Sequence, residues 1–195
     1  PIQESDLLTG ELEKTNDAYA IAKIAGIKMC ESYNIQYKTN YKCLMPTNTF
    51  GPNDNYNALN SHFFPALIKK AHDLKLNNKK ELILWGNGLA KREVIYVDDL
   101  ADACIFFMKK SFSGTTLNIG TGKDFSIKQY AKIILNKIMP KNKIKIKYDL
   151  SKPNGTPRKV LDIKLANKYG WKPKTQLDEA ITKTYLNFLE NNKIV

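Results

Sequence analysis

The sequence predicts an α/β protein. Short apolar segments with strand character alternate with longer segments of helical periodicity along most of the chain. Two of the predicted strands lead into turns of the form Gly-x-Gly, at residues 86–88 and 120–122. The 195 residues, of which 43% are hydrophobic, suffice for one domain or for a domain and a half.

The first predicted helix begins at Asn16 or Asp17, either of which can cap it, and runs to about Tyr37. Small or apolar residues recur on this helix at helical spacing, and they predict a face for close packing against a sheet or a second helix. These residues are Ala22, Ala25, Gly26, Met29 and Cys30.

The remaining elements follow from shorter patterns. Strands are predicted over residues 41–45, 81–85, 93–97, 116–119, 143–148 and 159–161, the first of them ending at Pro46. Helices are predicted over residues 62–74, 98–110, 126–138, 163–169 and 177–191. Ser61 is the candidate cap of the first of these helices, and Asp98 or Asp99 that of the second. The segments 47–61 and 151–157, rich in Asn, Gly or Pro, predict irregular loops.

The net charge of +12 raises the question of a nucleic-acid partner. The excess is almost entirely lysine, because Arg92 and Arg158 are the only arginines, and the lysines are spread along the chain. Since nucleic-acid recognition favours the bidentate fork of arginine, the lysines predict a solvated surface and no nucleic-acid partner. No apolar run approaches the roughly 20 residues that cross a bilayer, so no membrane association is expected.

Three cysteines, Cys30, Cys43 and Cys104, stand at unrelated spacings. Such spacings fit neither a disulfide framework nor a metal site. We therefore expect small buried thiols, no bound metal and a reducing, cytoplasmic location.

Tyr19 and Lys23 carry the first chemical signal. They lie four residues apart on a predicted helix, so their side chains share one face. An ammonium beside a phenol stabilises the phenolate, so a tyrosine paired in this way can act as an acid or base well below the usual pKa of about 10. By itself the pair is weak evidence, because chance matches at this spacing are common.

Longer runs give the pair a context. The sequences from Tyr19 to Gly26 and from Met45 to Pro52 resemble the extended short-chain dehydrogenase/reductase family. Supporting runs, in family order and at family-like spacing, are Asn60-Ser-His62, Trp85-Gly-Asn-Gly88, Arg92-Glu93 with Val97 to Ala103, Asn118 to Gly122, and Ser151 to Lys159. The resemblance covers essentially the whole chain. It is closest to the branch whose members epimerise C3 and C5 and reduce C4 of a GDP-linked 4-keto-6-deoxy sugar.

The resemblance implies the C-terminal part of a Rossmann-type parallel-sheet domain together with a smaller α/β substrate-binding domain. Residues 1–50 would belong to the NADP-binding domain and residues 51–195 mainly to the substrate-binding domain. Residues 93–122 would return to the Rossmann-type domain. The resemblance further implies a homodimer formed through helices that include the Tyr19–Lys23 helix.

The resemblance also implies roles for single residues. Tyr19 would give its proton to the C4 oxygen as hydride arrives from NADPH, and Lys23 would support that tyrosine and hold the nicotinamide ribose. His62 would exchange protons at the carbons that flank the ketone, paired with a cysteine. The residues implied to contact NADP(H) are Tyr19, Lys23, Pro46, Thr47, Asn48, Thr49 and His62. Those implied to contact the GDP-sugar substrate are Asn48, Lys70, Trp85, Arg92 and Lys159.

Each of these residues has a plain structural alternative that the sequence leaves open. Tyr19 can be a half-buried helix tyrosine, and Lys23 a solvated lysine. His62 can be a hydrogen-bonded residue at a helix N-terminus, Asn48 a loop cap, and Trp85 a core residue. Lys70 stands at a position where the family pattern allows arginine, and a lysine does not reproduce the bidentate phosphate contact of that residue.

Other residues are predicted to have no chemical role. His72 lies in a charged helical stretch and is predicted to be a surface residue, and Asp98 and Asp99 are predicted to be caps and not catalytic acids. The two Gly-x-Gly turns lack the third glycine of a dinucleotide-binding turn, because Lys91 and Phe125 stand in its place.

The chain begins with Pro1 and has the character of the remainder of a longer protein. The glycine-rich turn, the catalytic serine and the epimerising cysteine of the family are expected upstream of Pro1, so the chain alone is expected to be a poor catalyst. Alternative functions are a sister sugar-nucleotide epimerase or dehydratase, a non-catalytic sugar-nucleotide-binding module, and a basic nucleic-acid-binding protein.

Overall fold

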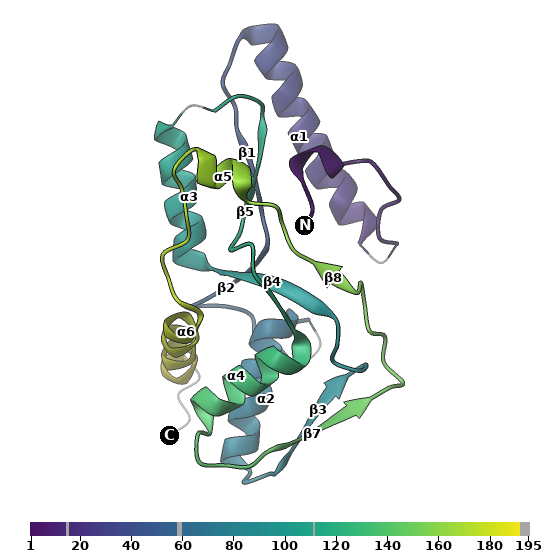
Figure 1. Ribbon diagram of the computed structural model, residues 1–195, viewed down its shortest axis with the longest axis vertical. Helices are drawn as coiled ribbons and strands as arrows, with labels where there is room; N and C mark the ends of the chain where they lie inside the picture. Colours follow the sequence, from purple (N-terminus) through teal and green to yellow (C-terminus); the bar gives the residue numbers. More distant parts are fainter. Residues whose placement is uncertain (15, 58–59, 111, 192–195) are drawn as a thin grey trace.

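The computed structural model describes residues 1–14, 16–57, 60–110 and 112–191. Figure 1 shows helices packed around several short sheets, with the first long helix lying to one side. The helices are η1 (Glu4–Asp6), α1 (Asp17–Tyr37), α2 (Phe63–Leu76), α3 (Val97–Lys109), α4 (Ile127–Ile138), α5 (Lys164–Lys168) and α6 (Leu177–Asn191). The strands are β1 (Cys43–Pro46), β2 (Asn48–Phe50), β3 (Glu81–Trp85), β4 (Lys91–Tyr96), β5 (Thr116–Ile119), β6 (Asp124–Ser126), β7 (Lys145–Asp149) and β8 (Arg158–Lys159).

Strand β4 is the centre of the sheet structure. It pairs in parallel with β2 and β8 and antiparallel with β6. Two further parallel pairs, β1 with β5 and β3 with β7, lie on either side of this mixed sheet in the chain fold (Figure 1). The predicted α/β class is confirmed, because parallel strands joined through helices dominate the fold.

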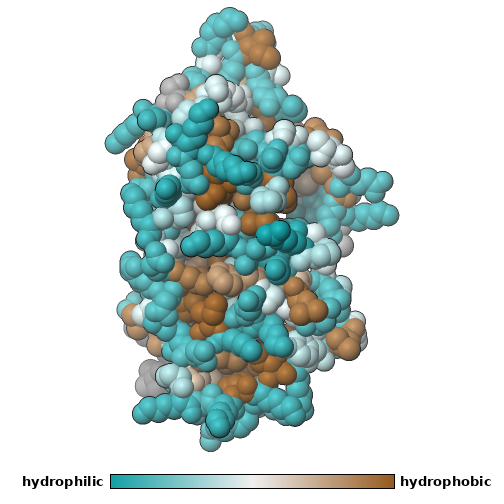
Figure 2. All heavy atoms as spheres, viewed as in Figure 1, coloured by the Kyte–Doolittle hydropathy of each residue, from teal (hydrophilic) through white to brown (hydrophobic). Residues whose placement is uncertain are grey.

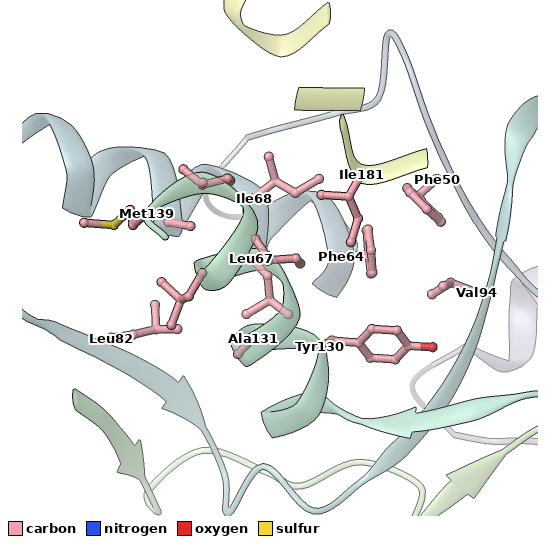
Figure 3. Close-up of a cluster of buried hydrophobic side chains, with 14 of the residues drawn as sticks. Phe50, Phe64, Leu67, Ile68, Leu82, Val94, Tyr130, Ala131, Met139 and Ile181 are labelled. Carbon is pink, nitrogen blue, oxygen red and sulfur yellow. The ribbon is translucent and has the colours of Figure 1, made fainter. Parts of the chain in front are cut away.

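The larger hydrophobic core lies among α2, α4, α6 and the sheet strands. In Figure 3, Phe64 and Leu67 of α2 meet Tyr130 of α4 and Ile181 of α6. The Phe64 ring lies 4.1 Å from that of Phe50, centroid to centroid, which brings the end of β2 against the first turn of α2. Such ring contacts add roughly 0.5–1.5 kcal/mol to the burial of the rings.

A second, smaller core lies between α3, β5 and α5. Its buried residues include Phe107, Leu117 and Trp171, and the Trp171 Nε1–H donates to Asp102 Oδ2 at 3.0 Å. Two separate cores indicate two packing units, although residues from the C-terminal part of the chain contribute to the second core. The predicted domain boundaries stay a prediction.

Two short strands were not predicted as strands. Residues 48–50, inside the predicted loop 47–61, form β2, and residues 124–126 form β6. Both pair with β4, which supplies the backbone hydrogen bonds that short, polar segments cannot supply to themselves. The prediction of an irregular loop is therefore wrong for residues 48–50, and residues 58–59 of that loop lie outside the described residues.

Most of the small-residue face of α1 is exposed in the described chain. Met29 is 60% exposed, Ala22 and Ala25 are also exposed, and no atom within 4 Å would meet a Cβ at Gly26. The prediction that this face packs closely is not met here.

The cysteines also differ from the prediction that all three are buried. Cys30 and Cys43 are half-buried and Cys104 is exposed.

Several polar residues differ from their predicted roles, and distant segments cover two of them, His72 and Asp99. His72 is buried, and its Nδ1 lies 3.0 Å from the Tyr185 hydroxyl of α6, so it is not a surface residue. Asp99 is buried and accepts the backbone N–H groups of Lys174 and Thr175, at 3.0 and 3.1 Å. The N-cap of α3 is Tyr96, so neither Asp99 nor Asp98 caps that helix, and His62 takes the N-cap position of α2 in place of Ser61.

Candidate active site

Helix α1 presents the predicted Tyr–Lys pair. Tyr19 and Lys23 lie one helical turn apart, and the Lys23 ammonium is 5.3 Å from the centre of the Tyr19 ring. Tyr19 is 61% exposed, so it is not the half-buried tyrosine of the structural alternative. Among the described residues, Lys23 has no ion pair with a carboxylate. The pair thus offers a phenol and an unpaired ammonium to an incoming ligand.

The loop that leaves β1 is held by one carbonyl of β4. Thr47 Oγ1 and Asn48 Nδ2 both donate to the Glu93 carbonyl oxygen, at 3.2 and 2.9 Å. The Thr47 N–H donates to the Ile119 carbonyl at 3.0 Å, so the loop is also tied to β5. Asn48 therefore makes the hydrogen bond expected of a residue that caps a loop. Its contact with a cofactor stays a prediction.

A pocket of about 280 Å³ collects three of the predicted substrate residues. Lys70 comes from α2, Trp85 from the end of β3 and Arg92 from β4. Ser61 and Asn154 add polar groups, and the wall between them is apolar: Phe63, Ala66, Leu67, Leu84 and Ile127. A mostly apolar cleft with a few convergent polar groups is the usual form of a small-molecule site.

The pocket carries positive charge. No Asp or Glu lines it among the described residues, whereas the Lys70 and Arg92 side chains both do. Burial lowers the pKa of Lys70 and of Arg92, because the pocket wall removes water from both cations. A partly desolvated pair of cations favours an anionic ligand, such as a phosphate group.

Trp85 lies near two ammonium groups. It is 59% exposed, so it is not a core residue, and the Lys70 and Lys152 ammoniums each lie 5.6 Å from its ring centre. The Lys70 ammonium also donates to the Ile83 carbonyl at 3.1 Å. The exposed ring can stack on a planar ligand, and the flanking cations suit a ligand with negative charge.

The loop between β7 and β8 completes the pocket. Arg92 donates to the Thr156 carbonyl oxygen at 2.6 Å, and the Asn154 side-chain oxygen accepts the Asn87 N–H at 2.7 Å. Lys159 pairs with Arg92 in the β4–β8 register, so this predicted residue lies beside the pocket arginine. Asn154 and Lys152 were missed as site residues, because no local periodicity marks a loop residue that a distant strand brings to a pocket.

His62 stands at the N-cap of α2, next to the pocket residue Ser61. Its side chain is exposed and makes no capping hydrogen bond, so it is not the hydrogen-bonded helix residue of the structural alternative. The structure thus gathers Ser61, Lys70, Trp85 and Arg92, with His62 and Lys159 beside them. No hydrogen bond or ion pair within the described residues joins Tyr19 or Lys23 to this group.

Comparison with known proteins assigns the fold and these residues to a family. The model of the NAD dependent epimerase/dehydratase family matches residues 1–120, more than half of the chain. The chain belongs to this family. Helix α1 and its Tyr–Lys pair, β1 and the Thr47–Asn48 loop, and most of the pocket fall within the matched residues.

Curated members of the epimerase/dehydratase family are similar over nearly the whole chain. A putative GDP-L-fucose synthase 2 of Arabidopsis thaliana is 46% identical over 98% of this chain. GDP-L-fucose synthase of Escherichia coli K12 is 42% identical over the same share. The chain spans 58% and 62% of the length of these two relatives.

The fold of the chain is similar to that of solved structures. A GDP-L-fucose synthetase from Naegleria fowleri bound to NADP superposes with a TM-score of 0.88 at 26% identity. The match covers 100% of this chain and 62% of that protein. The family name and this neighbour support a nicotinamide cofactor for the family to which the chain belongs.

The residues of α1 and the Thr47–Asn48 loop fit only one end of such a cofactor. A phenol, an unpaired ammonium and the second amide N–H of Asn48 are donors suited to ribose hydroxyls and a carboxamide. A dinucleotide also needs free backbone N–H groups for its pyrophosphate. The turn at Gly120 to Gly122 does not offer them, because the Thr121 and Gly122 N–H groups donate to the Glu93 carboxylate, at 2.5 and 2.7 Å.

Two further kinds of site were sought in the described residues. No three His, Cys, Asp or Glu side chains there gather closely enough to hold a metal ion. Each helix in the same residues is too short or too polar to cross a bilayer.

Proposed function

We propose that this chain carries the acid–base residues and the nucleotide-sugar pocket of a GDP-L-fucose synthase. That enzyme converts GDP-4-keto-6-deoxy-D-mannose into GDP-L-fucose by 3,5-epimerisation and NADPH-dependent 4-reduction. The observation that carries the proposal is the pocket of Lys70, Trp85 and Arg92, which has two cations, an exposed indole and no carboxylate. The names of the most similar relatives support GDP-L-fucose as the product.

The acid–base roles follow from the two sites. Tyr19 donates its proton to the C4 oxygen of the sugar, and the Lys23 ammonium stabilises the phenolate that remains. A bound NADPH would supply the hydride to C4. His62 exchanges protons at C3 and C5, the carbons that the neighbouring ketone makes acidic. Its exposed imidazole beside Ser61 supports this role.

The pocket residues hold the nucleotide. Arg92 and Lys70 neutralise the diphosphate, Trp85 stacks on the guanine, and Lys159 approaches the diphosphate from β8. Asn48 contacts the sugar and nicotinamide, together with Pro46, Thr47 and Thr49. The Arg92–Lys159 register supports a shared role for these two cations.

Two larger features belong to the same proposal. Residues 1–50 with 93–122 form the Rossmann-type part and the rest mainly the substrate-binding part. The smaller core supports this in part, because most of its buried residues lie within 93–122. The active molecule is a homodimer in the cytoplasm, and the exposed apolar side chains of α1 support association through that helix.

Binding of GDP to the purified chain tests the pocket. Arg92→Met removes the half-buried guanidinium and should raise the Kd for GDP at least tenfold, or about 1.4 kcal/mol. Arg158→Met is the matched control, because the second arginine of the chain pairs with Asp124 and does not line the pocket. Isothermal titration measures the affinity of both variants for GDP, with UDP as the comparison nucleotide. Equal affinities of the two variants, or no GDP binding, would contradict the proposal.

The reaction is tested separately in heavy water. GDP-4-keto-6-deoxy-D-mannose incubated with an active preparation should take up deuterium at C3 and C5 before NADPH is oxidised. His62→Asn should abolish this uptake while leaving GDP binding intact. A panel of other 4-keto sugar nucleotides separates this reaction from that of a sister epimerase or dehydratase, which would act on those substrates instead.

A further inference from the structure

A polar cluster lies at the corner between β2 and α2. The Phe50–Phe64 ring contact, at 4.1 Å, closes this corner, so the segment after Phe50 folds back onto the start of α2. Helix α6 supports the segment from the other side. The Asn53 N–H donates to Asn187 Oδ1 at 2.7 Å, and Asn191 Nδ2 donates to Asn53 Oδ1 at 3.0 Å.

Two polar atoms in this corner are buried without a hydrogen-bond partner among the described residues. They are Asp54 Oδ2 and the Tyr56 hydroxyl. The other oxygen of Asp54 accepts the Asn55 N–H at 2.7 Å, and the Tyr56 ring packs edge-on against Phe188 at 4.6 Å. Buried polar atoms are nearly always hydrogen-bonded, since leaving one unpaired costs about 1–3 kcal/mol. Within the part of the chain that the structure describes, Asp54 Oδ2 therefore lacks a donor.

His62 lies at the same corner, since it is the N-cap of α2 and stands two residues before Phe64. Burial raises the pKa of Asp54, whereas the charge of His62 and the N–H groups of Asn55 and Gly51 lower it. Burial also raises the pKa of Tyr56, and the negative charge of Asp54 raises it further, so the three side chains form one electrostatic group. The imidazole of His62 can supply the N–H that Asp54 Oδ2 lacks.

We propose that Asp54 is a positioning residue for His62, whose imidazole it holds through Oδ2 while the other ring nitrogen faces the sugar. The Tyr56 hydroxyl closes the inner side of the same corner. The proposal rests on the proposed acid–base role of His62 and adds the group that fixes its tautomer. A carboxylate that accepts one ring N–H leaves the opposite nitrogen ready to take or give a proton.

In the isosteric variant Asp54→Asn, residue 54 should donate the hydrogen bond to His62 instead of accepting it. The Asn55 N–H fixes the amide oxygen, so the new residue presents an N–H where the carboxylate presented an acceptor. The facing nitrogen of His62 must then lose its hydrogen, and the imidazole changes tautomer. Nitrogen-15 NMR of the two ring nitrogens reads the tautomer directly, and the chain has only two histidines to assign.

Asp73→Asn is the matched control, because Asp73 pairs with Lys69 on α2. We expect the ring-nitrogen pattern of His62 to exchange in Asp54→Asn and to stay unchanged in Asp73→Asn. An unchanged pattern in Asp54→Asn would overturn the proposal. The native chain provides a second measurement that needs no variant. Its neutral His62 should show one dominant tautomer, and a pattern averaged as in free imidazole would also overturn it.

Kinetics separate this proposal from the proposed function. Asp54→Asn should slow deuterium uptake at C3 and C5 at least about tenfold, with KM for the sugar nucleotide unchanged. A raised KM with an unchanged rate would overturn the positioning role. If His62→Asn exchanges at the native rate, the proposed function fails, while the NMR result still decides whether Asp54 holds the imidazole.

Discussion

At the scale of single residues, Glu93 forms hydrogen bonds with three segments that are far apart in the chain. Its side chain is fully buried, and its carboxylate accepts the N–H groups of Thr121, Gly122 and Leu161. Its carbonyl oxygen holds the Thr47–Asn48 loop. A Cβ at Gly120 would collide with the carboxylate, so this position requires glycine for a close approach. The carboxylate fills an anion site that backbone N–H groups create.

Glu93→Gln should therefore destabilise the protein strongly. The amide nitrogen of glutamine would meet a backbone N–H in place of an acceptor, which leaves buried donors unpaired and costs about 3 kcal/mol. Glu81→Gln is the control, because Glu81 forms an exposed ion pair with Lys147 and should matter by less than about 1 kcal/mol. Urea denaturation measures both variants. Similar midpoints for the two would show that Glu93 is not a structural centre.

At the scale of elements, α4 has a complete local start signal. The Ser126 hydroxyl oxygen accepts the Gln129 N–H at 3.2 Å, and the Gln129 side chain accepts the Ser126 N–H at 2.8 Å. This reciprocal pair is a capping box, which satisfies two N–H groups that the helix leaves open. The same helix carries Tyr130 and Ala131 into the larger core (Figure 3).

Ser126→Ala should destabilise the protein by about 1 kcal/mol, because it removes the side-chain half of the box. Ser5→Ala, at an exposed position in η1, should change the stability by less than about 0.5 kcal/mol. Thermal melting of both variants against the native chain checks the difference. A loss at Ser5 equal to that at Ser126 would contradict a capping role.

At the scale of the whole molecule, α1 is a helix of 21 residues none of which is fully buried. Tyr19, Ile21, Met29, Ile35 and Tyr37 on it are all more than half exposed. Figure 2 shows brown, hydrophobic residues exposed at the top of the molecule, where α1 ends in Figure 1. Apolar side chains that gather on one exposed helix are typical of a surface that another protein surface covers.

Ile35→Glu should therefore weaken self-association, since it places a charge in that surface. Ile35 is 73% exposed on α1, and the control Ile105→Glu changes an isoleucine that is 57% exposed on α3. Analytical ultracentrifugation over a range of concentrations should show a smaller associated fraction for Ile35→Glu and a native fraction for Ile105→Glu. A native chain that stays monomeric at all concentrations would contradict association through α1.

The sequence by itself determined the features that depend on local spacing. The four-residue interval of Tyr19 and Lys23 places both on one face of any helix, and Ser126 with Gln129 caps a helix wherever it packs. Most strands and helices were predictable for the same reason, because alternation and helical periodicity lie within a few consecutive residues. The epimerase/dehydratase family could likewise be inferred from ordered local runs.

Only the tertiary structure decided which residues share a site. Lys70, Trp85, Arg92 and Asn154 come from separate segments, and they meet because α2, β3, β4 and the loop before β8 pack together. The same packing buries His72 beneath α6 and makes β2 a strand beside β4, against the local pattern. Long-range pairing depends on surfaces far apart in the chain, and no local period encodes them.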